Sequence, residues 1–513
     1  MFNISNVYKN TCTSYLVLQA RYKKTIHWAK LKRKTSPKYK AQNHFDEFYG
    51  SVFGNKWEGM KEALLRRSKY VALVNNYGDA EQTMEELTNR GAHCLRKLIS
   101  TQEEFHKQFN ITPPPTQAPP QTDGQSDRLA AYIERQQTDE ISSIYPKTDN
   151  VPEKLDMGDD AERVDSKKVK EEISYPNKTL EESIADAQID ESRIIDPSLG
   201  MTSESLYQFL PATKLKGMDD FVAESVHYSY YSKEKDFPLL IEPETALNYP
   251  EHLKVYTYEM DSKATSFPEP RRCQTGVFNY YPMDCGSVLS VLALGLSAGD
   301  RVLDLCSAPG GKALVALQTL LPDVIVCNDI SISRMNRIQR SFKDYLFDFE
   351  TSNKWRERVI FKRIDGRLYT DDQGFDKVLV DVPCTTDRHS MNEDENNIFR
   401  PDRIKERLRI PEMQSQLLVN ALKLVKVGGT VVYATCSLSP VQNDGVVHMA
   451  LKHAFQAHSV VATIKDMSAP FSGLTGTLVL GSGNAAPKYG QLVTPSVGAN
   501  FGPSYIAKLV RVR

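Results

Sequence analysis

The sequence has few of the features that mark zinc proteins, secreted proteins or membrane proteins. Its eight cysteines form no C-x-x-C pair and no histidine cluster accompanies them, which argues against a zinc site and a disulfide framework. The apolar stretch at 15–18 is far too short to span a bilayer or to form a secretory signal, and no other run approaches membrane length. The cysteine pattern therefore indicates a reducing compartment.

Acidic residues are absent from the first part of the chain. No Asp or Glu precedes Asp46, although ten Lys and Arg residues do. Acid-free, basic starts that contain hydroxyl residues resemble mitochondrial transit peptides, so residues 1–43 are predicted to be one. The alternative is a disordered basic tail that contacts RNA or carries a nuclear signal. The whole chain is balanced, with 64 Lys and Arg against 65 Asp and Glu, which argues against a strongly basic field for gripping nucleic acid.

Composition divides the rest of the chain into four segments. Residues 44–108 carry apolar side chains at helical spacing and are predicted to form a helical N-terminal region. Residues 109–199 are rich in proline and polar residues and contain little to bury, which predicts a disordered insertion without chemistry of its own. Residues 200–270 are interpreted as an N-terminal extension of a domain at 271–513.

Strand-like and helix-like runs alternate after about Leu253. This alternation predicts the α/β class, with right-handed crossovers and a parallel, Rossmann-like sheet. The expected strands are 301–306, 324–330, 359–365, 377–381 and 430–435, and the expected helices are 310–320, 333–345 and 411–425. The last apolar run, 504–512, predicts a closing strand added at the edge of the sheet.

A glycine loop, Ala308-Pro309-Gly310-Gly311-Lys312, joins the first of these strands to a helix. The loop fits neither G-x-G-x-x-G nor the Walker A spacing, so a dinucleotide site is poorly supported. Its two glycines allow a ligand to approach the backbone closely, beside the free N–H groups of a helix N-terminus. Such groups suit the carboxylate of an amino-acid-type cofactor.

Three consecutive strands are each expected to end in an aspartate: Asp329, Asp365 and Asp381. An acid at the tip of the second strand of a doubly wound fold binds ribose hydroxyls, and Asp365 with Gly366 is well placed to meet an adenine edge. Each aspartate could instead be a helix cap or turn residue, which suits Asp329 in particular. Together with the glycine loop, the three aspartates predict S-adenosylmethionine as cofactor and an S-adenosylmethionine-dependent methyltransferase sheet.

Two further strand-like runs end in cysteine, at Cys384 and Cys436. A thiolate that adds to C6 of a pyrimidine makes C5 nucleophilic towards a sulfonium methyl group, and loss of the C5 proton then lets the thiolate leave. This chemistry needs an activated cysteine, a group that holds the ring at N3 and help in resolving the adduct. Cys436, Asp381 and Cys384 can fill these positions, whereas Cys306 and Cys327 are assigned to packing.

These motifs also carry a resemblance to a known family. The segments 381–385 and 434–438, downstream of 306–312, resemble the paired Pro-Cys and Thr-Cys motifs and the cofactor loop of the Nop/Sun family of RNA cytosine-5 methyltransferases. Five other segments are similar to the mitochondrial member of that family, which modifies ribosomal RNA: 278–281, 291–296, 384–390, 395–399 and 499–503. The resemblance covers about Leu253 to the C-terminus and, loosely, 44–76. Residues 112–199 have no counterpart in it.

The resemblance implies roles for particular residues. Cys436 would be the nucleophile, and Cys384 would assist product release. Cofactor contacts would fall on Gly310, Gly311, Lys312, Ala313, Asp329, Arg334, Asp365, Gly366 and Asp381. Ala313 departs from the hydroxyl residue usual in the family, so only a backbone contact would survive there. No metal is implied.

The resemblance also implies partners and a location. The substrate would be ribosomal RNA of a mitochondrial ribosomal subunit in the matrix, and an mTERF-type helical-repeat protein would supply much of the grip on RNA. This fits the near-neutral charge and the lack of an aromatic RNP pair or a GXXG loop in the sequence. No membrane is involved.

Three alternatives stay open. The chain could be a ribosome-assembly factor that binds rRNA and in which methyl transfer is secondary, although the two intact cysteines weigh against a purely structural role. A DNA cytosine methyltransferase is disfavoured by the Thr435-Cys436 pair. An amino-methylating enzyme would need an Asn/Asp-Pro-Pro-Tyr type motif where this chain has Val382-Pro383-Cys384.

Overall fold

The computed structural model describes residues 36–108, 237–262, 266–482 and 486–513. Residues 1–35 of the predicted transit peptide and the predicted insertion at 109–199 lie outside these ranges. In the part of the chain that is described, no helix combines the length and the apolar character needed to cross a bilayer.

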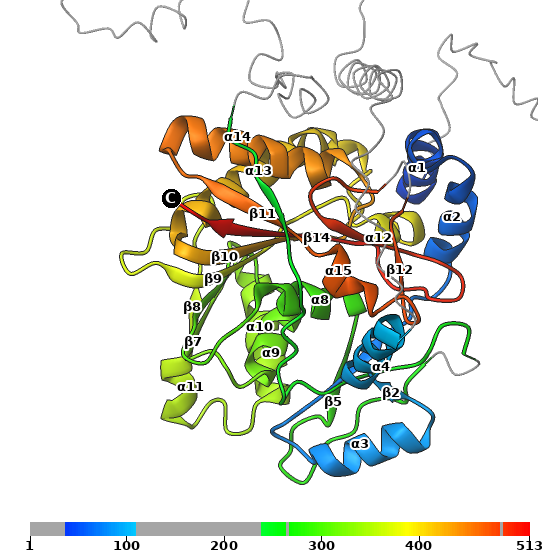
Figure 1. Ribbon diagram of the computed structural model, residues 1–513, viewed down its shortest axis with the longest axis vertical. Coiled ribbons are helices and arrows are strands. Elements are labelled where there is room, and N and C mark those ends of the chain that lie inside the picture. Colours follow the sequence, from blue (N-terminus) through cyan, green and yellow to red (C-terminus); the bar gives the residue numbers. More distant parts are fainter. Residues whose placement is uncertain (1–35, 109–236, 263–265, 483–485) are drawn as a thin grey trace, which may run out of the picture. The chain divides into compact units, whose positions relative to one another are not determined.

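A parallel sheet forms the centre of the fold, as the alternating pattern predicts (Figure 1). Its strands are, in spatial order, β8 (Val359–Lys362), β7 (Val324–Asn328), β6 (Arg301–Asp304), β9 (Phe375–Asp381) and β10 (Val425–Thr435). The chain runs outward from β6 through β7 to β8 and then crosses back to β9. The carboxyl ends of β6 and β9 therefore flank the switch point where ligands bind in doubly wound folds.

Antiparallel strands extend the sheet beyond β10. The closing strand β14 (Ser504–Arg511) pairs with β10 on one side and with β13 (Gln491–Thr494) and β11 (Ala462–Asp466) on the other. The strands β12 (Val479–Leu480) and β3 (Ile241–Pro243) then pair with β13 and β11. The closing strand is thus confirmed, but its predicted place at the sheet edge is wrong. Tyr505, Ile506, Ala507 and Leu509 are fully buried, because β14 is covered on both faces as a central strand is.

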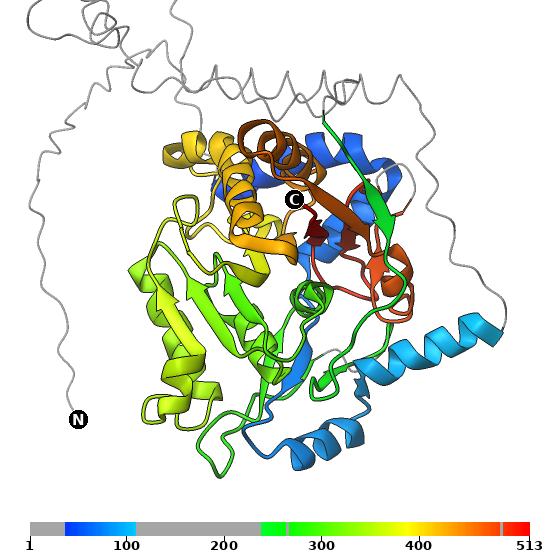
Figure 2. The same ribbon diagram turned by 60° about the vertical axis from the view of Figure 1, so that its left-hand side comes forward.

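Helices cover both faces of this sheet (Figures 1 and 2). One layer contains α13 (Ile404–Leu424) and α14 (Val446–His458), and the other contains α8 (Cys285–Leu294), α9 (Gly311–Gln318) and α10 (Ile332–Tyr345). Successive residues of a strand face opposite layers, so Val378 and Val380 pack in the first core while Leu379 packs in the second. Shorter helices connect these elements: α11 (Asn353–Arg358), α12 (Asp387–Asn392), η6 (Pro401–Arg403), the π-helix η7 (Val441–Gly445) and α15 (Ser468–Ser472).

The structure corrects one predicted helix boundary. Helix α13 begins at Ile404 and carries Pro411 inside it, although the sequence suggested a start at the proline. Leu408 before the proline and Leu417 after it are both buried. One apolar face therefore runs past Pro411, and its burial outweighs the loss of the single N–H donor that proline lacks.

The N-terminal region is helical only in part. Its helices are α1 (Pro37–Phe53), η1 (Gly54–Lys56), α2 (Trp57–Leu65), α3 (Ala80–Asn89) and α4 (Leu95–Gln108). Between them, β1 (Val71–Val74) and β2 (His93–Cys94) join β4 (Val255–Thr257) and β5 (Tyr280–Met283) in an antiparallel sheet of order β2-β4-β1-β5. The region predicted to be helical, 44–108, therefore also contains two strands. Their partners come from the other side of the insertion, which a local pattern cannot reveal.

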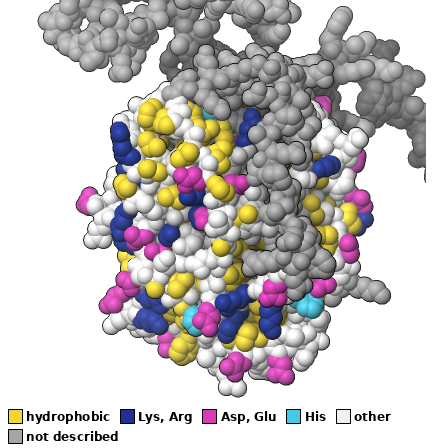
Figure 3. Space-filling model, viewed as in Figure 1, with side chains coloured by type: hydrophobic (Ala, Val, Ile, Leu, Met, Phe, Trp, Pro, Cys, Tyr) yellow, Lys and Arg dark blue, Asp and Glu magenta, His cyan; other side chains and the backbone are white. Residues whose placement is uncertain are grey.

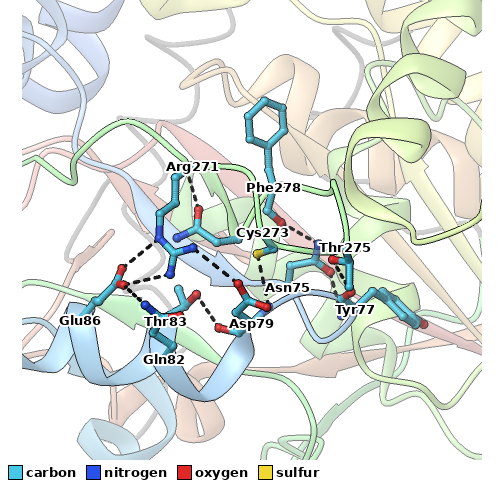
Figure 4. Close-up of polar contacts among 11 residues, drawn as sticks. Asn75, Tyr77, Asp79, Gln82, Thr83, Glu86, Arg271, Cys273, Thr275 and Phe278 are labelled. Atoms are coloured by element: carbon cyan, nitrogen blue, oxygen red, sulfur yellow. Dashed lines mark hydrogen bonds and ion pairs between the residues drawn. The ribbon is translucent and has the colours of Figure 1, made fainter.

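Polar side chains tie this second sheet to the helices of the central one. Asn75, which follows β1, donates hydrogen bonds from its Nδ2 to the carbonyls of Phe278 (2.7 Å) and Tyr345 (2.8 Å) and accepts one from Gln318 (2.8 Å). Figure 4 shows the same region, where Arg271 reaches across to Glu86 of α3 at 2.9 Å. The Asn75 contacts join the N-terminal sheet to α9 and α10.

Close approach also fixes the turn before α3. The Asp79 N–H donates to Cys273 Sγ at 3.3 Å, and a Cβ added at Gly78 would lie 2.7 Å from that sulfur (Figure 4). Only glycine fits at residue 78. Cys273 therefore has a packing role, and burial raises the pKa of its thiol.

Helix α1 belongs to the folded unit and overlaps residues 37–43 of the predicted transit peptide. Ala41 and Phe45 are buried against the core, and Gln42 Nε2 donates to the Met391 carbonyl at 2.9 Å. A leader that is removed without damage to this helix must therefore end before Pro37.

This packing predicts the effect of two substitutions on one helix. Phe45→Ala should lower the free energy of unfolding by about 3–5 kcal/mol, because a ring that is 1% exposed would leave a cavity. Tyr39→Ala on the same helix should change it by less than about 0.5 kcal/mol, because Tyr39 is 51% exposed. Chemical denaturation of the two variants checks this, and equal stabilities would show that α1 is not packed on the core.

Candidate active site

Two cysteine side chains meet at the carboxyl edge of the sheet. Strand β9 pairs in parallel with β10 so that Asp381 lies opposite Ala434, and each chain then leaves the sheet towards its cysteine. Cys384 Sγ and Cys436 Sγ lie 2.8 Å apart and share a hydrogen bond in which either sulfur can be the donor. Both cysteines are free thiols. Neighbouring strands thus bring together two residues that are far apart in sequence.

The two thiols differ in exposure. Cys384 is 8% exposed and therefore buried, whereas Cys436 is exposed. The hydrogen bond with Cys384, the dense protein around the sulfur and the negative charge of nearby groups such as Asp381 raise the pKa of Cys436 well above its ordinary value. Cys436 is consequently protonated at neutral pH, and a base must remove its proton before it can act as a nucleophile.

An ion pair lies beside the thiols. Lys312 Nζ, from the first turn of α9, is 2.5 Å from Asp381 Oδ2 at the end of β9. Burial alone would lower the pKa of Lys312, but Asp381 and the nearby Asp304 raise it above its ordinary value. Lys312 therefore remains a cation that balances the carboxylate of Asp381, and the pair can offer both a donor and an acceptor to a polar ring.

The glycine loop brings the start of α9 to the same edge. Gly310 is the N-cap of α9 with φ 101°, a conformation that favours glycine, and a Cβ there would lie 3.0 Å from Ile338 Cγ2. The N–H groups of the first helical turn have no acceptor within the helix and are available to an anion. The Ala313 side chain is buried in the core beneath this turn, so only its backbone N–H can serve a ligand, as expected for a residue without a hydroxyl.

Asp304, which the sequence analysis missed, is the most unusual carboxyl of the site. It ends β6 and is 1% exposed, and neither of its carboxylate oxygens has a hydrogen-bond partner among the described residues. Burial, together with the charge of Asp381, raises its pKa to about 7. The Ser307 hydroxyl is also buried without such a partner. Asp304 could have been noticed in the sequence as the acid near the end of the first expected strand, in Asp304-Leu305-Cys306.

These unpaired buried atoms fit an amino-acid-type cofactor. A buried carboxyl without partners costs free energy unless a donor is supplied, and an ammonium group is a strong donor. S-adenosylmethionine carries both an ammonium and a carboxylate, which Asp304 and the first turn of α9 respectively match. The residues present therefore fit the cofactor that the sequence predicts.

Asp329 follows β7, and the structure supports the turn interpretation for one of its oxygens. Its Oδ1 accepts from the Ser331 N–H at 2.9 Å at the start of α10, and its Oδ2 pairs with Arg334 at 3.2 Å. Arg334 also donates to the Ala308 carbonyl at 3.4 Å, which ties α10 to the glycine loop. A ribose would therefore share Asp329 with the helix. The exposed Ile330 beside it offers an apolar surface.

Asp365 lies in the loop after β8, not on the strand as predicted. The strand ends at Lys362 because the Asn328 side chain, rather than a strand, accepts from the Ile364 N–H at 3.0 Å. Both Asp365 oxygens bind Arg367, the closest at 2.7 Å, which lowers the pKa of Asp365. A Cβ at Gly366 would lie 2.7 Å from Leu417 Cδ2. Packing is thus sufficient to explain Gly366.

The loop after Cys384 is strained and heavily hydrogen-bonded. Thr386 has φ 45°, which costs a β-branched residue on the order of 1–3 kcal/mol. The fully buried Asp387 follows, and it contacts both cysteine loops and Tyr49 of α1. Sequence analysis missed Asp387 and Tyr49, because no motif links residues so far apart.

Among the described residues, no group of three His, Cys, Asp or Glu side chains could hold a metal ion.

Comparison with known proteins agrees with this geometry. A family model described as 16S rRNA methyltransferase RsmB/F matches residues 291–478. The 5-cytosine rRNA methyltransferase nsun-4 of Caenorhabditis elegans is 31% identical over 509 residues, which are 96% of this chain and 98% of that protein. The 5-cytosine rRNA methyltransferase NSUN4 of Mus musculus is 40% identical over 296 residues, 57% of this chain and 74% of that protein. A mitochondrial tRNA (cytosine(34)-C(5))-methyltransferase of Danio rerio is 34% identical over 242 residues, 45% of this chain and 61% of that protein.

The nematode match corrects one expectation. A match over 96% of this chain must include most of residues 112–199, for which the motifs suggested no counterpart. The similarity is thus not confined to the α/β domain. Because a relative resembles this chain along almost the full length of both, the chain belongs to the Nop/Sun family of RNA cytosine-5 methyltransferases.

Proposed function

We propose that this chain methylates C5 of a cytosine in ribosomal RNA, with S-adenosylmethionine as methyl donor and Cys436 as nucleophile. The observation that carries the proposal is the contact between an exposed thiol, Cys436, and a buried one, Cys384, at the ends of β10 and β9. An exposed thiol can reach an RNA base. The buried thiol beside it is placed to act on what the first has bound, so the difference in exposure supports Cys436 as the attacking group.

The covalent steps use residues of the site in turn. Cys436 loses its proton to a base and its sulfur bonds to C6 of the cytosine, while the Lys312–Asp381 pair holds the ring at N3 and the π electron pair of the C5–C6 double bond moves to C5. When bound, S-adenosylmethionine would supply the electrophilic methyl group that C5 takes, and the electron pair of the broken S–CH3 bond would stay on its sulfur. A base then removes the C5 proton, the C5–C6 double bond forms again and the Cys436–C6 bond breaks. Cys384 is the group nearest to Cys436 that can assist this release.

Four parts of the chain would hold the cofactor. The backbone N–H groups at the start of α9 suit its carboxylate, Asp304 its ammonium, Asp329 its ribose and Asp365 its adenine. The other predicted cofactor residues would contribute in different ways. Gly310, Gly311, Ala313 and Gly366 would offer backbone groups to the cofactor. Arg334 orients Asp329, and Lys312 and Asp381 lie between the cofactor loop and the thiols.

Location and partners are proposed from the leader and the charge. The acid-free residues 1–36 support import into the mitochondrial matrix. Because the chain is nearly neutral overall, with basic and acidic side chains interspersed on the face in Figure 3, a helical-repeat partner of the mTERF type would add affinity for RNA. The substrate would then be the RNA of a mitochondrial ribosomal subunit.

The thiol assignment predicts opposite behaviour for two variants. Cys384→Ala should trap a covalent protein–RNA adduct, because attack by Cys436 remains possible while release is impaired. Cys436→Ala should give neither adduct nor methyl transfer. A denaturing gel with RNA and S-adenosylmethionine separates the outcomes, with Cys94→Ala, a partly exposed cysteine of β2, as the active control. An adduct trapped by Cys436→Ala would instead move the nucleophile to Cys384.

The cofactor assignment is tested at Asp329. Asp329→Asn keeps an acceptor for the Ser331 N–H but loses the charge, so the turn before α10 should be kept. The Kd for S-adenosylmethionine should rise about 10- to 100-fold, the value of a hydrogen bond to a charged group. Calorimetry that gives the wild-type Kd in a folded Asn variant would remove Asp329 from the site.

Depletion and rescue test substrate and location together. Loss of the protein should remove 5-methylcytosine from mitochondrial rRNA but not from cytosolic rRNA or mitochondrial tRNA. The full chain should restore the mark, whereas a chain beginning at Pro37 and the Cys436→Ala variant should not. If Cys436→Ala restores ribosome assembly without the mark, methyl transfer is secondary to an assembly role. Restoration of the mark by the chain without its leader would contradict the import signal.

A further inference from the structure

A single carboxylate lies beneath the two thiol loops. Asp387, at the start of α12, is fully buried, and its Oδ2 accepts hydrogen bonds from Tyr49 Oη (2.6 Å) and the Leu438 N–H (2.7 Å). Its Oδ1 accepts from Thr385 Oγ1 at 2.5 Å. Ser437 Oγ lies 3.2 Å from both oxygens. Several donors therefore converge on one carboxylate.

These donors come from the residues next to the two cysteines. Thr385 directly follows Cys384, and Ser437 directly follows Cys436. Their hydroxyl oxygens lie 3.1 Å apart, so Asp387 closes a ring of hydrogen bonds between the loops. The Gln442 side chain of the π-helix η7 extends the ring, because its Oε1 accepts from the Thr385 N–H and its Nε2 donates to Thr385 Oγ1, both at 3.1 Å. We name these residues (Tyr49, Thr385, Asp387, Ser437 and Gln442) the loop clamp.

The remaining member of the ring comes from α1. The Tyr49 ring is 1% exposed and stacks on Phe45 with ring centroids 4.9 Å apart, so its hydroxyl is held in place below the loops. Burial and the charge of Asp387 raise the pKa of Tyr49 well above its ordinary value, which keeps the hydroxyl protonated and able to donate. Helix α1 thereby contacts Asp387 but neither cysteine sulfur among the described contacts.

The clamp acts where the backbone would not hold its shape alone. Thr386 lies between Cys384 and Asp387 with a left-handed φ of 45°, and its N–H is 3.4 Å from Cys384 Sγ. A residue with a Cβ rarely adopts this conformation unless its surroundings impose it. The bonds on Asp387, together with those that join Thr385 to Gln442 and Ser390, hold the residues on either side of Thr386 in place.

We propose that Asp387 and Tyr49 form a positioning pair that holds the Cys384 and Cys436 loops together, so that the two thiols can act on the same base. This inference rests on the proposed roles of the two cysteines in catalysis. Asp387 does not contact either sulfur among the described contacts, and it acts through Thr385 and Ser437. Its effect is on alignment, to which covalent catalysis is sensitive at the scale of one ångström.

The test uses Tyr49→Phe in the full-length chain, which removes one hydroxyl and keeps the buried ring. Diamide oxidises two neighbouring thiols to a disulfide and takes up both electrons and both protons in its azo bond, so its rate with Cys384 and Cys436 reports their alignment. The variant should form this disulfide about tenfold more slowly, and its kcat for RNA methylation should fall by a similar factor with KM unchanged. Tyr280→Phe is the matched control, because it also loses one hydrogen bond from a buried tyrosine, to the Pro268 carbonyl in the N-terminal sheet. It should behave as wild type.

Ser437→Ala provides a second break in the clamp, from the Cys436 loop. It should slow disulfide formation in the same way, and adding Tyr49→Phe to it should cause less than a further tenfold loss, because both changes loosen one unit. Wild-type disulfide rates in both folded single variants would overturn the proposal. Formation of the Cys384–Cys436 disulfide requires neither RNA nor S-adenosylmethionine. If Cys436→Ala retains methyl transfer, the proposed function fails while the diamide result still decides the role of Asp387.

Discussion

The parallel pairing of β9 with β10 is the constraint on which the rest of the site depends. Its register sets Asp381 opposite Ala434, and the two chains leave the sheet side by side towards Cys384 and Cys436. A slip of one residue would turn every side chain of a strand to the other face and move Val431 and Tyr433 from the core under α13 and α14 into the opposite core, where Val432 packs. The same burial that specifies the core therefore also fixes the separation of the thiols.

Burying carboxyl groups at the site lowers the stability of the fold. Asp304 is a clear example: burial raises its pKa from an ordinary value near 3.8 to about 7. As the pH rises from about 4 to about 7, Asp304 ionises in the unfolded chain but stays protonated in the folded protein. The contribution of Asp304 to stability therefore falls over this range. Lys312 offsets part of this cost by pairing with Asp381, and the large cores on both faces of the sheet carry the remainder. Preorganised charge at the sheet edge is thus maintained by apolar packing elsewhere.

The sequence could predict features that repeat locally or end a strand. Alternation placed the parallel sheet and α9 and α10, and the strand ends singled out Cys384, Cys436 and Asp381. It could not predict contacts that join distant segments. Strand β1 pairs with β4 and β5 across the insertion. The sequence placed β14 at the sheet edge because its neighbours on the far side, β11 and β13, carried no recognisable pattern of their own. Gly366 illustrates a different limit, because a glycine needed for packing against Leu417 resembles one needed by a ligand.

The same limit explains why the first seven residues of α1, 37–43, were assigned to the leader. Composition alone does not show where the basic segment ends and α1 begins. The start of α1 depends on its packing against Phe399 and the loop that follows Cys384, which are distant in sequence. Tyr49 and Asp387 are 338 residues apart in the chain, and closing so long a loop costs conformational entropy that only a formed core can offset. Alignment of the thiols therefore requires both the β9–β10 pairing and the docking of α1 against the loop that follows Cys384.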